Sequence, residues 1–387
     1  MSVFLDHAST TPVRPKALEA YLEALAHLGN PSSVHAHGRE TRELLEQARE
    51  LLAKAADCNQ AEVIFTSGGS EANNQAIKGF FWQRQQEKTR KYIISALTEH
   101  HAVIDPIQWL ETHEGAQVLW IPVDKTGQLD LAVYQGFLSQ YSDEIALVSL
   151  MWVNNETGAI WDIPTIAKLA NQHGIPVHSD AVAAFGHTPT SFAGSGLAAM
   201  SISGHKLGAP IGVGALLVSR NQKPISLIHG GGQERGLRSG TMNYPHALSL
   251  AKAAVLAIED MTEREAKLKA LRDQLEAELL AQIPQAKKTI SGPRIDHTAS
   301  FILPGAQSDS LLFLLDQKGI SVSAGSACQA GVLGASHVLL AMGYDESEAS
   351  SVIRVSLGHS TTESDIQLFT SAIAEVYSTA LRAGQGR

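Results

Sequence analysis

The chain has few cysteines and no long apolar run. Its 387 residues include only Cys58 and Cys328, too few for a disulfide framework or a four-thiolate zinc site. No stretch approaches the roughly 18 apolar residues of a membrane span. The first residues, Met1 to His7, lack the charged and apolar regions of a secretion signal. These absences predict a protein of the reducing cytoplasm that does not contact a membrane.

An excess of positive charge is also missing. Acidic residues outnumber basic ones by 39 to 30, and the formal net charge is −9. We therefore expect no direct binding of nucleic acid. Apolar residues make up 44% of the chain and charged residues 18%, a balance typical of a globular protein with a large core. The length allows two domains.

Short apolar strands alternate with helical stretches along the first two thirds of the chain. Branched residues predict strands at 62–66, 91–95, 145–149, 176–179, 199–202 and 213–218. A helical pattern over 166–171 ends before Gly174. This alternation predicts an α/β fold with a mainly parallel, buried sheet, in which the last two of these strands pair antiparallel.

A second unit follows a long helical stretch. No glycine or proline occurs between Pro245 and Pro284, and Thr262 and Glu265 have the spacing of a capping box that starts a new helix. We place a boundary near residue 260, which gives a large domain at 15–260 and a smaller α/β domain at 1–14 and 261–387. Strands at 300–303, 320–322 and 353–355 are expected in the smaller domain.

Two segments that follow strands have residues suited to a phosphorylated cofactor. The run 66–71 contains two glycines and opens a helix, whose free N–H groups suit a phosphate; the alternative is a tight strand-to-helix turn. Lys206 ends the run Ser203-Gly204-His205-Lys206 among small residues, where partial desolvation favours the neutral amine needed for a Schiff base. The alternative is a surface lysine in a glycine-rich loop.

Acidic and histidine side chains follow two further strands. Asp180 could keep a pyridinium nitrogen protonated, or it could cap a helix. His100 or its neighbour His101 could stack on an aromatic ring and move protons, or could simply be hydrogen-bonded structure. A third interpretation combines His178, Asp180, His100 and His101 in a metal site, which we do not favour because no further carboxylate–histidine cluster supports it.

Three further features indicate a substrate site. Cys328 lies in a run of small residues, 325–331, so a reactive thiol and a structural thiol are both open, whereas Cys58 is taken as incidental. The segment 230–241 has two arginines among glycines, which indicates contact with an anion unless it is a flexible connector. Arg354 lies within a strand, where a charge is costly unless paired, so we expect it to face a site and bind a carboxylate.

Together these segments resemble a known family. The chain is similar to the cysteine desulfurases of the NifS/IscS type, class-V aminotransferase-like enzymes that use pyridoxal 5'-phosphate (PLP). The resemblance runs from Leu5 to Gly358. The matching segments are 5–12, 29–33, 66–74, 99–103, 154–158, 203–206, 230–241, 323–328 and 354–358. It implies the type I fold of PLP-dependent transferases, with a seven-stranded sheet in the large domain and a homodimer with two sites.

The resemblance also implies the cofactor-binding residues. Lys206 would hold PLP as a Schiff base and later move the proton on the substrate carbon. Asp180 would bind the pyridine nitrogen, and His100 would stack over the ring. The other cofactor contacts that the resemblance implies are Gly69, Ser70, Asn155, Ser203, His205 and, from the other subunit, Thr241. No metal is implied.

The implied reaction converts L-cysteine to L-alanine. Asn155 and Arg354 would hold the substrate carboxylate, and Cys328 would take the sulfur as a persulfide. A protein acceptor would then receive this sulfur, for iron–sulfur cluster assembly or for thiolation of transfer RNA. Selenocysteine lyase, a class-V aminotransferase and a non-catalytic sulfur-transfer scaffold are the alternatives.

One position departs from the family pattern. The family commonly has Asp-Ala-x-Gln, whereas this chain has Asp180-Ala181-Val182-Ala183. Ala183 cannot donate the hydrogen bond that the glutamine would give the phenolic oxygen of the cofactor. We therefore expect slower or spectrally altered chemistry, with the cofactor retained.

Overall fold

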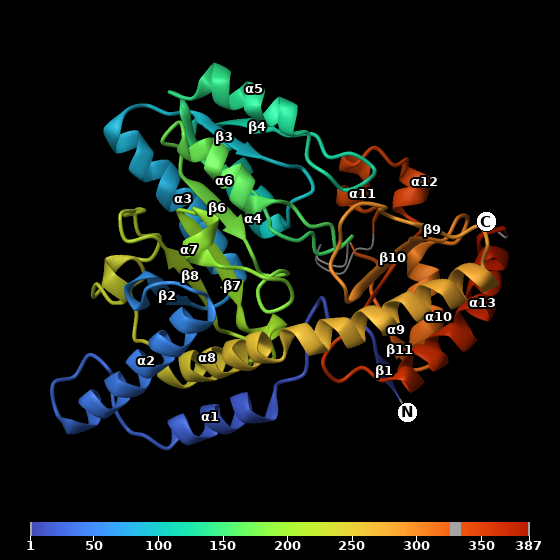
Figure 1. Cartoon of the computed structure of the whole chain (residues 1–387), viewed down its shortest axis with the longest axis horizontal. Helices are drawn as coiled ribbons and strands as arrows, with labels where there is room; N and C mark the ends of the chain where they lie inside the picture. Colours follow the sequence, from blue (N-terminus) through green and yellow to red (C-terminus); the bar gives the residue numbers. More distant parts are fainter. Residues whose placement is uncertain (1, 326–333, 386–387) are drawn as a thin grey trace.

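The computed structural model describes residues 2–325 and 334–385. We call residues 15–260 the large lobe and the rest of the described chain the small lobe. In Figure 1 the large lobe holds one central sheet covered by helices, and the long helix α9 (Met261–Gln282) leads from it along the small lobe.

A seven-stranded sheet forms the centre of the large lobe, in the order β2-β8-β7-β6-β5-β3-β4. Four of its pairings are parallel, but β8 runs antiparallel to both of its neighbours, β7 and β2. The predicted mainly parallel sheet is confirmed, with two antiparallel pairings instead of one. The strands are β2 (Val63–Thr66), β3 (Tyr92–Ser95), β4 (Gln117–Trp120), β5 (Ile145–Ser149), β6 (Val177–Asp180), β7 (Ala199–Ser203) and β8 (Gly214–Val218).

Successive side chains of each strand face opposite sides of this sheet, and both sides are covered. Ile64 and Leu216 pack with α3 and α4, whereas Val63 and Leu217 pack with the core that contains α2, α6 and α8. The helices of this lobe are α1 (Pro15–Leu25), α2 (Ala36–Ala55), α3 (Gly69–Glu87), α4 (His101–Glu114), α5 (Leu131–Tyr141), α6 (Ile163–Asn171), α7 (Phe192–Ser195) and α8 (Tyr244–Glu259), with 3-10 turns η1 (Gln60–Glu62), η2 (Gly204–Lys206) and η3 (Glu234–Gly236).

The small lobe contains both ends of the described chain, at residues 2 and 385. β10 (Thr298–Ile302) pairs antiparallel with β12 (Val352–Ser356) and β9 (Lys287–Lys288), and β1 (Val3–Phe4) pairs parallel with β11 (Ile320–Ser321). The blue N-terminal strand therefore lies among the orange and red elements in Figure 1. The other helices are α10 (Ser308–Gln317), α11 (His337–Ala341), α12 (Glu346–Ala349) and α13 (Glu363–Gln385).

The predicted capping box at the start of α9 is wrong. The N-cap residue is Asp260, with no side-chain cap, and Thr262 and Glu265 do not form the reciprocal pair. Glu265 instead lies within hydrogen-bond distance of His187 and His297. Buried leucines at 268, 271, 275 and 279 do lie at the predicted helical spacing and pack in the small-lobe core. Within residues 2–325 and 334–385, no helix combines the length and apolar character needed to cross a membrane.

Candidate active site

A cavity of about 300 Å³ lies at the carboxyl ends of β6 and β7. Asp180 ends β6, Ser203 ends β7, and Ser70 lies in the first turn of α3. Carboxyl ends of parallel strands meet at one edge of a sheet, which is why residues distant in sequence converge here. The predicted site residues that line the cavity are Gly69, Ser70, His100, Asn155, Asp180, Ser203, His205, Lys206 and Arg354.

Lys206 reaches across the cavity wall to the N-terminal segment. Its Nζ donates hydrogen bonds to the carbonyl oxygens of Ala8 (2.5 Å) and Ser9 (2.7 Å). Lys206 ends η2 directly after β7, so its backbone is fixed by the sheet. The alternative of a surface lysine in a loop does not describe this side chain. The amine lies in a cavity wall to which the small lobe contributes Ala8 and Ser9.

The Asp180 carboxylate is held at the floor of the cavity. It is 6% exposed, accepts from Asn73 Nδ2 at 2.6 Å through Oδ2, and accepts from the Val182 amide at 2.9 Å through Oδ1. It does not cap a helix, because the next helix, α7, begins at Phe192. Asn73 Oδ1 is buried without a hydrogen-bond partner. Asn73 was not among the predicted site residues, although it lies within the matching segment 66–74.

Two histidines of the cavity are held neutral. His100 caps α4 by accepting from the Ala102 amide through Nδ1 at 3.0 Å. Burial lowers the pKa of His100; Asp180 opposes this effect and Lys206 adds to it. Burial, helped by the charge of Lys206, lowers the pKa of His205 to about 4. Neutral imidazoles beside a carboxylate and an amine suit stacking and hydrogen bonding.

The first turn of α3 offers backbone N–H groups to the cavity. Gly68 is the N-cap residue and Gly69 the first helical residue. A Cβ at Gly69 would lie 2.7 Å from Val182 Cγ2 and 3.4 Å from Ser203 Cβ, so a side chain there would collide with the cavity wall. The free N–H groups and positive dipole end of this helix suit an anion such as a phosphate.

Arg354 is paired, in a way that sequence analysis did not predict. One terminal nitrogen donates to Asp6 Oδ1 at 2.8 Å and the other to the Asn155 carbonyl oxygen at 2.7 Å. Arg354 Nε and Asn155 Oδ1 are buried without a partner. Both residues line the cavity, so the guanidinium retains donor capacity beside it.

Two predicted site residues lie elsewhere. Cys328 falls in 326–333, outside the described residues. Thr241 is exposed and does not line the cavity of its own chain. Within 230–241, Arg238 donates to Glu71 at 2.9 Å, and buried Glu234 binds Arg49. Cys58 is half-buried, and burial raises the pKa of its thiol to about 12.

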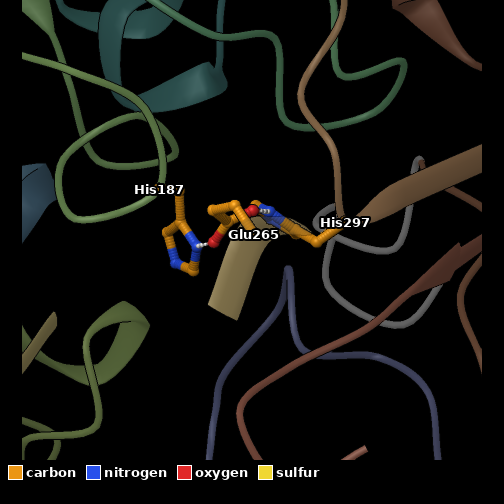
Figure 2. Close-up of side chains that lie close together, drawn as sticks. All are labelled: His187, Glu265 and His297. Carbon is orange, nitrogen blue, oxygen red and sulfur yellow. Dashed lines mark hydrogen bonds and ion pairs between the residues drawn. The ribbon is translucent and has the colours of Figure 1, made fainter. Parts of the chain in front are cut away.

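The structure does not assemble the metal ligands that we considered. His178 is fully buried between Ser149 and Ser201, each 2.9 Å from one of its ring nitrogens. Among the described residues, the group that could supply three ligands is a different one, formed by His187, Glu265 and His297 (Figure 2).

Figure 2 shows that Glu265 lies between the two histidines. His187 Nδ1 lies 3.1 Å from Oε1 and His297 Nδ1 lies 3.2 Å from Oε2. Arg264 Nε is also 3.2 Å from Oε1, so a guanidinium already occupies the cationic position beside this carboxylate. Hydrogen bonds satisfy the group without a metal, and they join the large-lobe segment at His187 to the small lobe.

Comparisons with known proteins show the family of this chain. Residues 3–369 match the family described as aminotransferase class-V. The IscS-like cysteine desulfurase of Mycobacterium tuberculosis is 44% identical, with 98% of each chain covered. The cysteine desulfurase NifS of Azotobacter vinelandii is 38% identical, over 94% of this chain and 90% of the relative. The chain belongs to the NifS/IscS cysteine desulfurases of the class-V aminotransferase family.

A solved structure of the family has the same fold. The NifS-like protein from Rickettsia africae superposes with a TM-score of 0.87 at 32% identity, covering 98% of this chain and all of the other. The type I transferase fold and the family resemblance are thereby confirmed.

Enzymes of this family depend on PLP, and the residues of this cavity fit it. The cavity offers one group for each part of PLP. The buried carboxylate would accept a hydrogen bond from a protonated ring nitrogen, and the amine would bind the aldehyde carbon. The helix start and the two hydroxyls would bind the phosphate. The partnerless buried atoms of Asn73 and Asn155 leave polar capacity that a bound polar group would use.

Proposed function

We propose that this chain is a PLP-dependent cysteine desulfurase that converts L-cysteine to L-alanine and stores the sulfur as a persulfide on Cys328. The observation that carries the proposal is the convergence of Lys206, Asp180 and His100 on one cavity, which Arg354 also lines. In the bound state PLP supplies an electron-poor ring that weakens the bonds at the α-carbon of the amino acid.

Each residue around the cavity has a separate role in binding the cofactor or moving a proton. Lys206 holds the cofactor through its amine and moves a proton at the substrate carbon. Asp180 would bind the ring nitrogen, and His100 would stack on the ring. The phosphate is bound by the start of α3 together with Ser70, Ser203 and His205. The support for these roles is that every one of these side chains lines the cavity.

Substrate binding and sulfur transfer use residues of both lobes. Arg354, with Asn155, binds the substrate carboxylate. The Cys328 thiol attacks the substrate sulfur, so that an S–S bond forms while the C–S bond breaks. The electron pair of the broken bond stays on carbon, which takes up a proton and leaves as alanine. Cysteine and the enzyme thiol together become alanine and the persulfide, and no outside oxidant is required.

The enzyme acts as a homodimer in this proposal, in the cytoplasm, and passes its sulfur to a protein acceptor. The support for the dimer is an apolar face of α1 with Leu18, Leu22 and Leu25 between 44% and 57% exposed, beside Leu28 at 78%. Thr241, exposed on its own chain, contributes to the cofactor site of the partner. We also propose that the chain has two domains, a large one at 15–260 and a small one at 1–14 and 261–387.

The decisive experiment feeds L-cysteine to the purified enzyme and measures alanine. We expect the wild-type chain to release alanine and to carry a persulfide on Cys328. Lys206→Ala should abolish alanine formation, and Cys328→Ala should abolish sulfur transfer. Cys58→Ala is the matched thiol control and should behave as wild type. Wild-type sulfide and alanine production in Cys328→Ala would remove the thiol from the mechanism.

A further inference from the structure

The carboxylate of Glu156 lies between two parts of the chain that are close to Cys328 in sequence. Ser336 Oγ donates to Glu156 Oε2 at 2.5 Å. A Cβ built on Gly325 would lie 2.8 Å from the same oxygen, so the carboxylate occupies the space that a side chain at position 325 would need. Gly325 and Ser336 lie on either side of the segment 326–333, which includes Cys328. One oxygen atom therefore binds one flank of that segment and lies where a side chain on the other flank would be.

The residue type on each flank suits its position beside the Glu156 carboxylate. Gly325 has a φ of +70°, a conformation that favours glycine, and any side chain there would meet the carboxylate. Ser336 caps α11, and its hydroxyl oxygen accepts from the Leu339 amide at 3.2 Å. Because a hydroxyl can accept and donate at once, its proton remains for Glu156. The Ser336 amide donates to the Ala349 carbonyl, which fixes this flank to the small lobe.

Glu156 is itself held in a rigid turn at the active site. Asn154 Oδ1 accepts from the amides of Glu156 (3.0 Å) and Thr157 (2.8 Å), and Asn154 Nδ2 donates to the Thr98 carbonyl at 2.9 Å. The residue between them, Asn155, lines the cavity. Neighbouring residues of one turn thus contact the cavity on one side and the flanks of the Cys328 segment on the other.

The groups around Glu156 partly offset the cost of burying its carboxyl group. Glu156 is 2% exposed, and burial raises its pKa, while His337, Ser336, Arg354 and His101 oppose that effect. His337 Nε2 donates to the Glu99 carbonyl at 2.9 Å, so its Nδ1, 3.8 Å from Glu156 Oε1, faces the carboxylate. A buried carboxylate is costly unless hydrogen-bond donors or positive charges lie beside it, as these groups do here.

We propose that Glu156 is a positioning residue for sulfur transfer: it holds Ser336 by a hydrogen bond and leaves room only for a glycine at position 325, and so sets both flanks of the Cys328 segment against the turn that contains Asn155. This inference rests on the proposed function, in which Cys328 takes the sulfur. Glu156 does not line the cavity, and its role is exerted through the two flanks.

The test uses the holoenzyme and the variants Glu156→Ala, Glu156→Gln and Ser336→Ala. One readout is the rate of Cys328 alkylation by iodoacetamide, followed by peptide mass spectrometry with Cys58 as the internal reference. The second is kcat and KM for alanine formation, expressed per bound cofactor. Glu348→Gln is the matched control, because this carboxylate of the small lobe pairs with the exposed Lys287 and makes no hydrogen bond to either flank.

We expect Glu156→Ala to lower kcat at least tenfold, with KM within twofold, and to increase the alkylation rate of Cys328 at least threefold. Glu156→Gln, which keeps an acceptor for Ser336, should fall between Glu156→Ala and wild type. Ser336→Ala should resemble Glu156→Gln, and Glu348→Gln should match wild type. A purely structural role would reduce cofactor content or thermal stability and leave kcat per bound cofactor unchanged.

Unchanged kcat, or alkylation that is no faster than in wild type, would overturn the inference. If Glu156→Ala does not retain cofactor, Ser336→Ala decides, since Ser336 lies outside the cavity lining. A wild-type enzyme that forms no alanine would instead refute the proposed function. In that case the alkylation rates still show whether Glu156 holds the flanks, so the two failures are distinguishable.

Discussion

Arg354 in β12 and Asp6, two residues after β1, form an ion pair with 2.8 Å between Nη2 and Oδ1. The pair joins the last strand of the small lobe to the first residues of the chain. Asp6 Oδ2 also accepts from Ser9 Oγ, and the Ser9 carbonyl accepts from Lys206. Residues 6–9 therefore connect the proposed substrate-binding arginine with the proposed cofactor-binding lysine.

This connection predicts a substrate-binding defect in Asp6→Asn. The charge that orients the guanidinium is removed, so Arg354 is held less firmly for the substrate carboxylate. We expect KM for cysteine to rise roughly tenfold while kcat stays within about twofold, the pattern of a lost charge-assisted hydrogen bond in binding. Steady-state alanine formation checks this. Equal effects on kcat and KM would instead place Asp6 in the chemical step.

Ala183 predicts a gain from restoring a longer side chain. It lines the cavity beside Lys206 and Asp180, where its methyl group can donate no hydrogen bond. Ala183→Gln should raise kcat by up to about tenfold, the equivalent of one hydrogen bond, and shift the absorption of the bound cofactor. Ala183→Leu is the control for bulk alone and should not produce the gain. An identical spectrum and rate in Ala183→Gln would contradict the expectation.

Buried histidines predict a steep loss of stability in acid. Burial lowers the pKa of His178 from 6.5 to about 3, whereas the unfolded chain titrates near 6.5. The unfolded state therefore binds more protons below pH 6.5, and the stability that neutral His178 provides is lost as the pH falls toward 3. His187 adds to the same trend, since burial, with the charge of His297 second, lowers its pKa to about 4.

Urea unfolding at a series of pH values measures this trend. Each buried histidine contributes up to about 1.4 kcal/mol per pH unit to the slope of the unfolding free energy. His178→Gln should reduce the slope between about pH 6 and about pH 4.5 by close to one proton. A slope equal to that of wild type would show that His178 does not titrate in this way.

The exposed face of α1 predicts a subunit contact. Ala17, Ala20 and Ala24 pack inward, whereas Leu18, Leu22 and Leu25, spaced along the same helix, face outward. Leu22→Asp combined with Leu25→Asp places two charges in the proposed dimer interface and should yield monomers in sedimentation experiments. Lys16→Asp, a charge change on the same helix, is the control. A dimer that persists in the double variant would remove α1 from the interface.

Much of the cavity was predictable from local sequence. Lys206, Asp180 and Ser203 lie at ends of strands that branched residues mark clearly, and the edge geometry of a parallel sheet brings such ends together. The glycines at 68 and 69 mark the helix start for the same local reason. The strand β4 was missed because Gln117–Trp120 lies at the sheet edge, with three residues half-buried and one exposed, so it lacks a continuous apolar pattern.

The sequence by itself determined the order of strands and helices, the family and the residue types at the cofactor cavity, because local periodicity and short motifs encode these. Only the tertiary structure decided which charges meet. Arg354 with Asp6, Glu265 with His187 and His297, and Glu156 with Ser336 join positions far apart in the chain. Such pairs depend on how packed cores bring separate elements together, and no local pattern records that.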